Sequence, residues 1–209
     1  MSSLLILAAG GHGKVVAETA LAAGSVSSIA FLDDRPLPPV LGWPVLGPLE
    51  LALDPLLKAQ FPLASVAIGH SVTRLLWVER LQGAGYQLPL LIHPSASISP
   101  SAHIGSASVV FANAVVQAQA MIGTGSILNT GSSVDHDVHL ASGVHLCPGA
   151  HLAGEVHVGA RSCIGIGASV IQNVSIGSDV TVGAGAVVVS DLPDGVTAVG
   201  VPARVLSPC

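Results

Sequence analysis

The stretch Val134-Asp-His-Asp-Val-His-Leu140-Ala-Ser-Gly-Val-His-Leu146-Cys-Pro-Gly-Ala-His-Leu152 repeats one pattern every six residues. An aliphatic residue opens each unit, a small or β-branched residue follows four positions later, and a histidine precedes the next aliphatic residue. The pattern continues in both directions, so that all sixteen sixth positions from Ile98 to Val188 are Ile, Leu or Val. A run of this length is a hexapeptide repeat, which predicts a parallel β-helix.

The repeat also predicts the geometry of this helix. Three hexads make one triangular coil, so residues 18 apart stack at about 4.8 Å, the spacing of neighbouring strands. The large aliphatic side chain points inward on each face, and the small residue fits the crowded interior. No residue interrupts the repeat, so no loop insertion is expected, and the tail after Val188 can cap the stack.

The N-terminal part of the chain follows a different rule. Strand-like and helix-like segments alternate there, which is typical of a parallel α/β sheet. We therefore expect two domains, a small Rossmann-like α/β domain at 1–90 and a β-helix domain at 91–209. Strands are predicted at 4–8, 29–34 and 65–69, and helices at 14–23, 49–59 and 72–82.

Composition excludes several classes of partner. The net charge is −5 and only 9% of residues are charged, which argues against a nucleic-acid-binding surface. The apolar runs fall well short of the roughly 20 residues of a membrane span, and the N-terminus lacks a basic signal-peptide region. The three cysteines, Cys147, Cys163 and Cys209, have no CxxC spacing and predict reduced thiols in a cytoplasmic protein.

The chain has nine histidines, and the repeat sorts most of them. His103, His139, His145, His151 and His157 occupy the sixth position of a hexad, where a side chain points outward. For His139, His151 and His157 a solvated or interface-lining role is the expected one.

His136 differs because it occupies the third position of its hexad, at a corner, between Asp135 and Asp137. The residue stacked on it one coil later is Gly154. An imidazole beside a carboxylate is suited to general-base catalysis. A glycine above it leaves room for an acyl group and offers a backbone N–H to an oxyanion. The alternative is a surface corner residue that adjoins two acids.

Four motifs carry a resemblance to a known family. They are Val199-Gly-Val-Pro-Ala-Arg204, Asn129-Thr-Gly-Ser-Ser-Val-Asp-His-Asp137, Ala8-Ala-Gly-Gly-His-Gly13 and Phe31-Leu-Asp-Asp34. With the hexads, the first two resemble the left-handed β-helix acyltransferases. With the N-terminal motifs, the chain resembles bacterial sugar acetyltransferases, among them UDP-4-amino-sugar N-acetyltransferases and sialic acid O-acetyltransferase-like proteins.

The resemblance implies a left-handed β-helix and a homotrimer in glycan biosynthesis. Acetyl-CoA would lie along the helix between adjacent subunits, and the α/β domain would hold a nucleotide sugar. The acetyl group would pass directly to the sugar amine without an acetyl-enzyme, and no metal would be required.

The resemblance also assigns roles to single residues. His136 matches the general base, and Asp137 matches the acid that raises its basicity, where the family often has glutamate. Gly154 matches the glycine whose N–H meets the acetyl carbonyl. The remaining matches are His145, Gly154, Ile166 and Ser175 for CoA, and Gly10, Gly11, His12, Asp33, Asp34 and Gly69 for the nucleotide sugar.

The residues of the N-terminal loop point the same way on their own. A glycine-rich turn between a strand and a helix lets backbone N–H groups approach a phosphate. The segment Gly10-Gly-His-Gly13 lacks the GxGxxG spacing, which disfavours a redox dinucleotide, and Asp33-Asp34 can take a ribose or a uracil N–H. The alternative is an ordinary turn of an α/β fold.

Three other functions remain open on the sequence. Within the enzyme class, the acceptor can be a hydroxyl of a sugar or sialic acid, since the base and the CoA groove would be the same. A zinc-dependent β-helix hydratase would use three histidines across a trimer interface. A non-catalytic nucleotide-sugar-binding scaffold would keep the loop and the β-helix but would not bind CoA.

Overall fold

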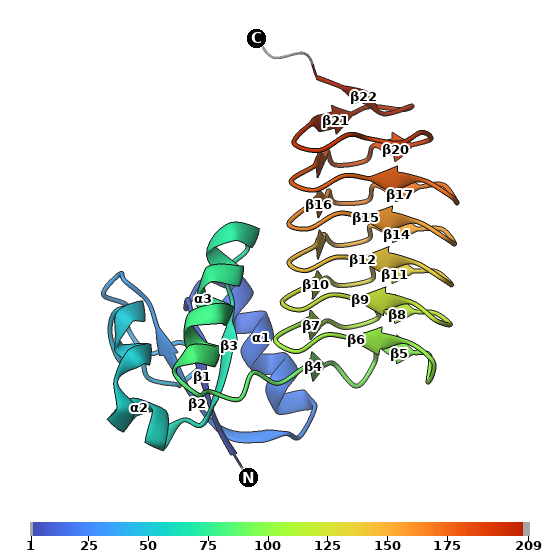
Figure 1. The fold of residues 1–209 in the computed structure, drawn as a ribbon. Helices are drawn as coiled ribbons and strands as arrows, with labels where there is room; N and C mark the ends of the chain where they lie inside the picture. The colour runs from blue at the N-terminus through green and yellow to red at the C-terminus, as the bar shows by residue number, and fades with distance from the viewer. Residues whose placement is uncertain (1, 207–209) are drawn as a thin grey trace. The chain divides into compact units, whose positions relative to one another are not determined.

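The computed structural model describes residues 2–206, and the chain forms two compact units, Met1–Pro94 and Ser95–Cys209 (Figure 1). The predicted boundary after residue 90 lies four residues earlier. Cys147 and Cys163 form no disulfide within residues 2–206, whereas Cys209 lies outside the described residues. Among residues 2–206, no helix has the length and apolar composition needed to cross a lipid bilayer.

The N-terminal unit is built on a three-stranded parallel sheet in the order β2–β1–β3. Its central strand is buried without alternation from Leu4 to Leu7, as expected for a parallel strand that is covered on both faces. The elements are β1 (Ser2–Leu7), α1 (Gly11–Ala22), β2 (Val26–Leu32), β3 (Leu63–Val66) and α3 (Ser71–Gly83).

One predicted helix, at 49–59, is divided in two. A 3₁₀ helix, η1 (Leu49–Leu53), precedes α2 (Pro55–Gln60). Asp54 lies between them with an extended backbone, which is the conformation that a following proline favours. Its side chain caps α2 by accepting the N–H of Leu56 at 2.8 Å.

The second unit is a parallel β-helix, as the repeat predicts (Figure 1). Two-residue strands recur every six residues, preceded in the chain by β4 (Leu91–Ile92). They are β5 (Ser97–Ile98), β6 (His103–Ile104), β7 (Val109–Val110), β8 (Val115–Val116), β9 (Met121–Ile122), β10 (Ile127–Leu128), β11 (Ser133–Val134), β12 (His139–Leu140), β13 (His145–Leu146), β14 (His151–Leu152), β15 (His157–Val158), β16 (Cys163–Ile164), β17 (Ser169–Val170), β18 (Ser175–Ile176), β19 (Thr181–Val182) and β20 (Val187–Val188).

These strands form three faces. The first face runs from β7 through β10, β13 and β16 to β19, the second from β5 through β8, β11, β14 and β17 to β20, and the third from β6 through β9, β12 and β15 to β18. From β5 to β17, each strand pairs in parallel with the strand 18 residues on, as His139 does with His157. The predicted register is therefore confirmed.

The core consists of the inward aliphatic column. Of its sixteen members, fourteen are buried, and Ile98 and Ile104 in the first coil are half-buried. At each corner from residue 107 to residue 185, the third residue after the aliphatic one turns the chain with φ between +57° and +73°. Glycine, Asn and Asp tolerate this left-handed conformation, which explains much of the corner composition.

The stack ends in a short hairpin. β21 (Thr197–Val199) pairs in parallel with β19, and β22 (Arg204–Val205) pairs with β21 in the antiparallel direction. The tail after Val188 thus adds a last pair of strands to the first face, in the place where the sequence predicts a cap.

Candidate active site

His136 lies at the corner between β11 and β12, on the exposed side of the helix. Its Nδ1 is 2.9 Å from Oδ2 of Asp137, and its backbone N–H donates to Oδ1 of Asp135 at 2.8 Å. Asp137 is the left-handed residue of this corner, with φ +57°. The turn at Asp137 brings its carboxylate alongside the preceding ring, so adjacent residues form a His–Asp pair.

The surroundings of His136 favour the protonated imidazolium. Its pKa is raised above 6.5, first by the hydrogen bond to Asp137 and then by the charges of Asp135, Asp137 and Glu155, although partial desolvation lowers it. In the neutral ring, donation from Nδ1 to Asp137 leaves the lone pair on Nε2. Nε2 is then a base stronger than an isolated imidazole.

Gly154 stacks directly on this ring. A Cβ at position 154 would lie 2.5 Å from Cε1 and 2.6 Å from Nε2 of His136. The space left by the missing side chain is therefore filled by the imidazole itself rather than by an acyl group. The Gly154 carbonyl accepts the N–H of Asn173, whereas its own N–H donates to no acceptor within residues 2–206.

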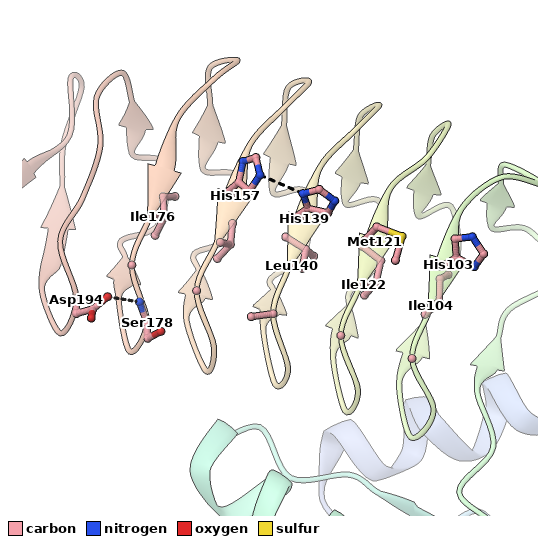
Figure 2. Close-up of a pocket in the computed structure, with 16 residues that line it drawn as sticks. His103, Ile104, Met121, Ile122, His139, Leu140, His157, Ile176, Ser178 and Asp194 are labelled. Carbon is pink, nitrogen blue, oxygen red and sulfur yellow. Dashed lines mark hydrogen bonds between the residues drawn. The ribbon is translucent and has the colours of Figure 1, made fainter.

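Two hollows lie along the third face. A groove of about 840 Å³ follows the outward column of His103, Met121, His139 and His157, in which Nδ1 of His139 is 3.0 Å from Nε2 of His157 (Figure 2). A second hollow of about 610 Å³ adjoins the His136 corner. It is lined by Asp137, His139, Glu155, His157, Asn173 and Ser175. Ser175 is a predicted CoA contact on this side, as is Gly154 at the His136 corner.

The other two predicted CoA contacts lie elsewhere on the helix. His145 is in β13 on the first face, and Ile166, with 60% of its surface exposed, follows β16 at the corner between the first and second faces. His136 lies at the corner between the second and third faces. Within one chain, the predicted CoA contacts are thus divided between different faces and corners of the triangular coil.

In the N-terminal unit, a cavity of about 360 Å³ lies beside the glycine-rich turn. Gly10 and Gly11 line it, as predicted for a phosphate-binding loop. Lys14 and Arg35 line it as well, although neither residue was predicted from the sequence to bind the nucleotide sugar. Their position in the sequence was a usable signal, because Lys14 follows the turn directly and Arg35 follows the two acids.

The carboxylates of Asp33 and Asp34 both accept hydrogen bonds from within the protein. Oδ1 and Oδ2 of Asp33 accept from the Arg35 guanidinium at 2.9 Å each, and Oδ2 also accepts the Ala9 N–H at 2.9 Å. The Arg35 hydrogen bonds hold the pKa of Asp33 well below its usual range. Asp34 accepts the Leu49 N–H at 2.9 Å. Asp33 therefore orients Arg35, which does line the cavity.

His12 and Gly69 are placed away from that cavity lining. Burial, and secondly the charge of Arg74, lower the pKa of His12 to about 4, so the ring is neutral at neutral pH. The Gly69 carbonyl accepts from Nη1 of Arg74 at 2.7 Å. Of the six predicted nucleotide-sugar residues, Gly10 and Gly11 are the two that line the cavity.

Both units of the chain are similar to proteins of known structure or family. Residues 3–81 match the family model of the PglD N-terminal domain. The acetyltransferase domain of PglB from Neisseria gonorrhoeae is 48% identical, with a TM-score of 0.95 over 99% of this chain and 100% of that chain. The same domain in complex with acetyl coenzyme A is 50% identical, with a TM-score of 0.93 over 98% of each chain.

A third similar structure is a histidine-to-alanine mutant of the GDP-perosamine N-acetyl transferase from Caulobacter crescentus, in complex with CoA and GDP-perosamine. It is 41% identical, with a TM-score of 0.95 over 100% of this chain and 98% of that chain. The comparison with curated proteins gives no match. Identity at this level over the full length of both units shows that the chain belongs to the hexapeptide-repeat sugar acetyltransferases.

Proposed function

We propose that this chain transfers the acetyl group of acetyl-CoA to the amine of a UDP-linked 4-amino sugar, with His136 as general base. The observation that carries the proposal is the His136–Asp137 pair, 2.9 Å apart and stacked on Gly154. The complexes of the similar enzymes with acetyl-CoA, and with CoA and GDP-perosamine, support the two classes of ligand.

In the proposed reaction, the sugar amine attacks the thioester carbonyl. The C–N bond forms as Nε2 of His136 takes a proton from the amine, and the Gly154 N–H stabilises the oxyanion. The C–S bond then breaks, and His136 returns the proton to the CoA thiolate. The hydrogen bond to Cys163, together with burial, raises the pKa of the Cys147 thiol, so this cysteine is a poor nucleophile for an acetyl-enzyme.

The division of the CoA contacts supports a site between subunits. His136, Asp137 and Gly154 come from one corner of the coil, and His145 and Ile166 from another face and corner. A neighbouring chain that presents its Ile166 corner to the His136 corner would complete the site. A cyclic trimer repeats this contact three times and closes.

The nucleotide sugar is assigned to the glycine-rich turn. Helix α1 begins at Gly11, so its first N–H groups and positive dipole end face the turn. Lys14 and Arg35 supply two positive charges in the same cavity, which suits a diphosphate. Asp33 acts through Arg35, by holding the guanidinium in place.

The test is a thiol-release assay with acetyl-CoA and matched UDP- and GDP-linked 4-amino sugars. We expect turnover with the UDP-linked amine and a loss of about 10²-fold or more in His136→Ala. His151→Ala is the matched control, because His151 occupies a sixth position in β14, on the second face.

Each other outcome identifies a different error. Preference for the GDP-linked amine would correct the nucleotide. Turnover only with hydroxyl acceptors would make the chain an O-acetyltransferase. Full activity in His136→Ala would remove the base assignment, and failure to bind CoA at all would favour a nucleotide-sugar-binding scaffold.

A further inference from the structure

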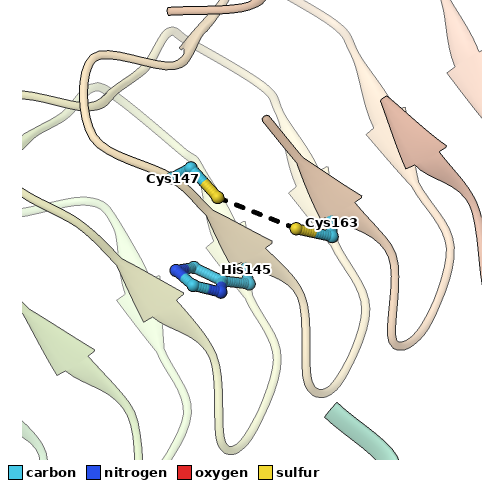
Figure 3. Close-up of side chains that lie close together, drawn as sticks. All are labelled: His145, Cys147 and Cys163. Carbon is cyan, nitrogen blue, oxygen red and sulfur yellow. Dashed lines mark hydrogen bonds between the residues drawn. The ribbon is translucent and has the colours of Figure 1, made fainter. Parts of the chain in front are cut away.

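Three potential metal ligands gather on the first face of the β-helix. Figure 3 shows His145, Cys147 and Cys163, whose ligand atoms all lie within 4.8 Å of one another. His145 and Cys147 are two residues apart, so their side chains leave the same side of the strand. Cys163 pairs with His145 across β13 and β16. The register of the repeat therefore assembles the cluster.

The separation of the sulfurs fits a shared metal ion. Sγ of Cys147 and Sγ of Cys163 are 3.7 Å apart. Two thiolates at about 2.3 Å from a tetrahedral zinc ion are separated by about 3.8 Å. A disulfide would require about 2.05 Å. The two thiols thus already stand at the edge length of a zinc tetrahedron.

The backbone holds all three residues in place. The N–H groups of His145, Cys147 and Cys163 donate to carbonyls of the next coil at 2.9, 2.9 and 2.8 Å. Side-chain rotation alone is then needed to close the remaining separations to the roughly 3.5 Å of a nitrogen–sulfur edge. Little ordering is required on binding, which favours affinity.

A polar side chain, that of Asn129, lies beside the His145 imidazole. The side-chain amide nitrogen of Asn129 lies 3.3 Å from Nε2 of His145. Metal-bound histidines usually bond a neighbour through the second ring nitrogen, which fixes the ring. With Nδ1 as the ligand, Asn129 fills this role only if its amide oxygen, which accepts the Thr130 N–H at 2.9 Å, gives up that bond and turns toward the ring.

We propose that His145, Cys147 and Cys163 form a zinc-binding site with three protein ligands and an open fourth position. Two thiolates and one imidazole suit zinc, whereas Mg²⁺ and Ca²⁺ prefer oxygen ligands. Binding releases the two thiol protons to solvent and changes no oxidation state. The site shares His145 with the predicted CoA contacts, but its test measures metal binding and requires no acetyl transfer.

The first experiment titrates Zn²⁺ into the full, reduced and metal-stripped chain in competition with a chromophoric chelator. We expect one zinc ion per chain. Cys147→Ser and Cys163→Ser should each weaken binding by about 100-fold or more, since even an outer-shell partner costs about 10- to 100-fold. His151→Ala, a sixth-position histidine on another face, is the matched control and should bind as wild type.

A second measurement needs no variant. Co²⁺ added to the stripped wild-type chain should give a sulfur-to-metal charge-transfer band and the intense visible bands of a tetrahedral site, both removed by Zn²⁺. Absence of the charge-transfer band would overturn the proposal. So would zinc binding that both cysteine variants retain, or a Cys147–Cys163 disulfide found by peptide mapping of the unreduced protein.

Discussion

At the scale of single residues, the proposed chemistry depends on what surrounds His136. Asp137 is the largest cause of its raised pKa and the acceptor that fixes its tautomer. Gly154 provides the surface on which the ring rests. One residue sets the proton affinity of the base and the other sets its position, so the two effects can be separated by substitution.

Replacing Asp137 should change the pH dependence of turnover. A base works only when deprotonated, so the wild type loses activity as pH falls through the raised pKa of His136. Asp137→Asn removes the charge and keeps a residue that tolerates the left-handed corner. The pKa of His136 then falls, and the acid limb of the kcat/KM profile moves to lower pH.

The matched control for this profile is Asp135→Asn. Asp135 acts on the pKa of His136 through its charge, without a hydrogen bond to the ring, so this variant should move the limb less. An acid limb that stays in place in Asp137→Asn, or that moves to higher pH, would show that His136 is not the titrating base.

Adding one methyl group at Gly154 should displace the base. In Gly154→Ala, the new Cβ would meet the His136 ring at 2.5 Å, so the ring must move away. We expect kcat to fall by about 10²-fold, as a misplacement of about 1 Å can do. Gly83→Ala, where a Cβ meets nothing within 4 Å, is the control and should retain full activity.

At the scale of secondary-structure elements, the β-helix is held by its ladder and by a few buried hydroxyls. Oγ of Ser162 donates to the Gly177 carbonyl at 2.7 Å and accepts the Val180 N–H at 3.0 Å. Oγ of Ser132 is just as buried and has no hydrogen-bond partner within residues 2–206. Serines at equivalent positions of the repeat are therefore expected to contribute differently to the free energy of unfolding.

These two serines give a matched pair of stability measurements. Ser162→Ala leaves a buried N–H and a part-buried carbonyl without this hydroxyl and should cost about 1–3 kcal/mol of unfolding free energy. Ser132→Ala removes a buried hydroxyl that bonds nothing and should be neutral or stabilising. Urea denaturation monitored by far-ultraviolet circular dichroism compares them, and equal losses would contradict this account.

The register of the elements was predictable from sequence because it depends on chain spacing alone. The stacking of His136 on Gly154, 18 residues apart, follows from the hexads. The Cys147–Cys163 contact does not follow from the hexads. These residues are 16 apart, so the contact is diagonal between neighbouring coils and depends on the direction of the side chains. The division of the predicted 49–59 helix depends on Pro55, a local signal that the apolar periodicity hid.

The N-terminal cavity also shows that side-chain contacts are harder to predict from sequence than backbone pattern. Its turn glycines were predicted from the strand–turn–helix pattern, whereas Lys14 and Arg35 enter it through long side chains. Asp33 looked like a ligand contact because it ends a strand, yet its oxygens are already bonded to Arg35 and Ala9. Backbone pattern locates such a site, and side-chain pairing decides which residues face it.

At the scale of the whole molecule, the separation of the His136 and Ile166 corners leads to a test of subunit sharing. Native mass spectrometry should show three chains per particle. His136→Ala and Ile166→Asp should each inactivate the homotrimer, the second by placing a charge where CoA is proposed to run. Differently tagged copies of the two variants, co-expressed and purified as mixed trimers, should regain activity.

The reason is that mixed trimers contain interfaces with an intact His136 from one chain and an intact Ile166 from the other. Preformed homotrimers mixed without unfolding are the control and should stay inactive. Mixed trimers without activity would place both residues of a working site in the same chain.

The eighteen-residue register also constrains how such a chain can change in length over evolution. Loss of eighteen residues removes one whole coil and leaves the corners of all remaining coils aligned. Loss of six shifts all later residues by one face, so a histidine and its glycine would no longer meet, and loss of one turns the aliphatic column outward. Insertions and deletions that preserve the fold should therefore add or remove whole coils, so the lengths of related β-helices should differ by multiples of eighteen residues.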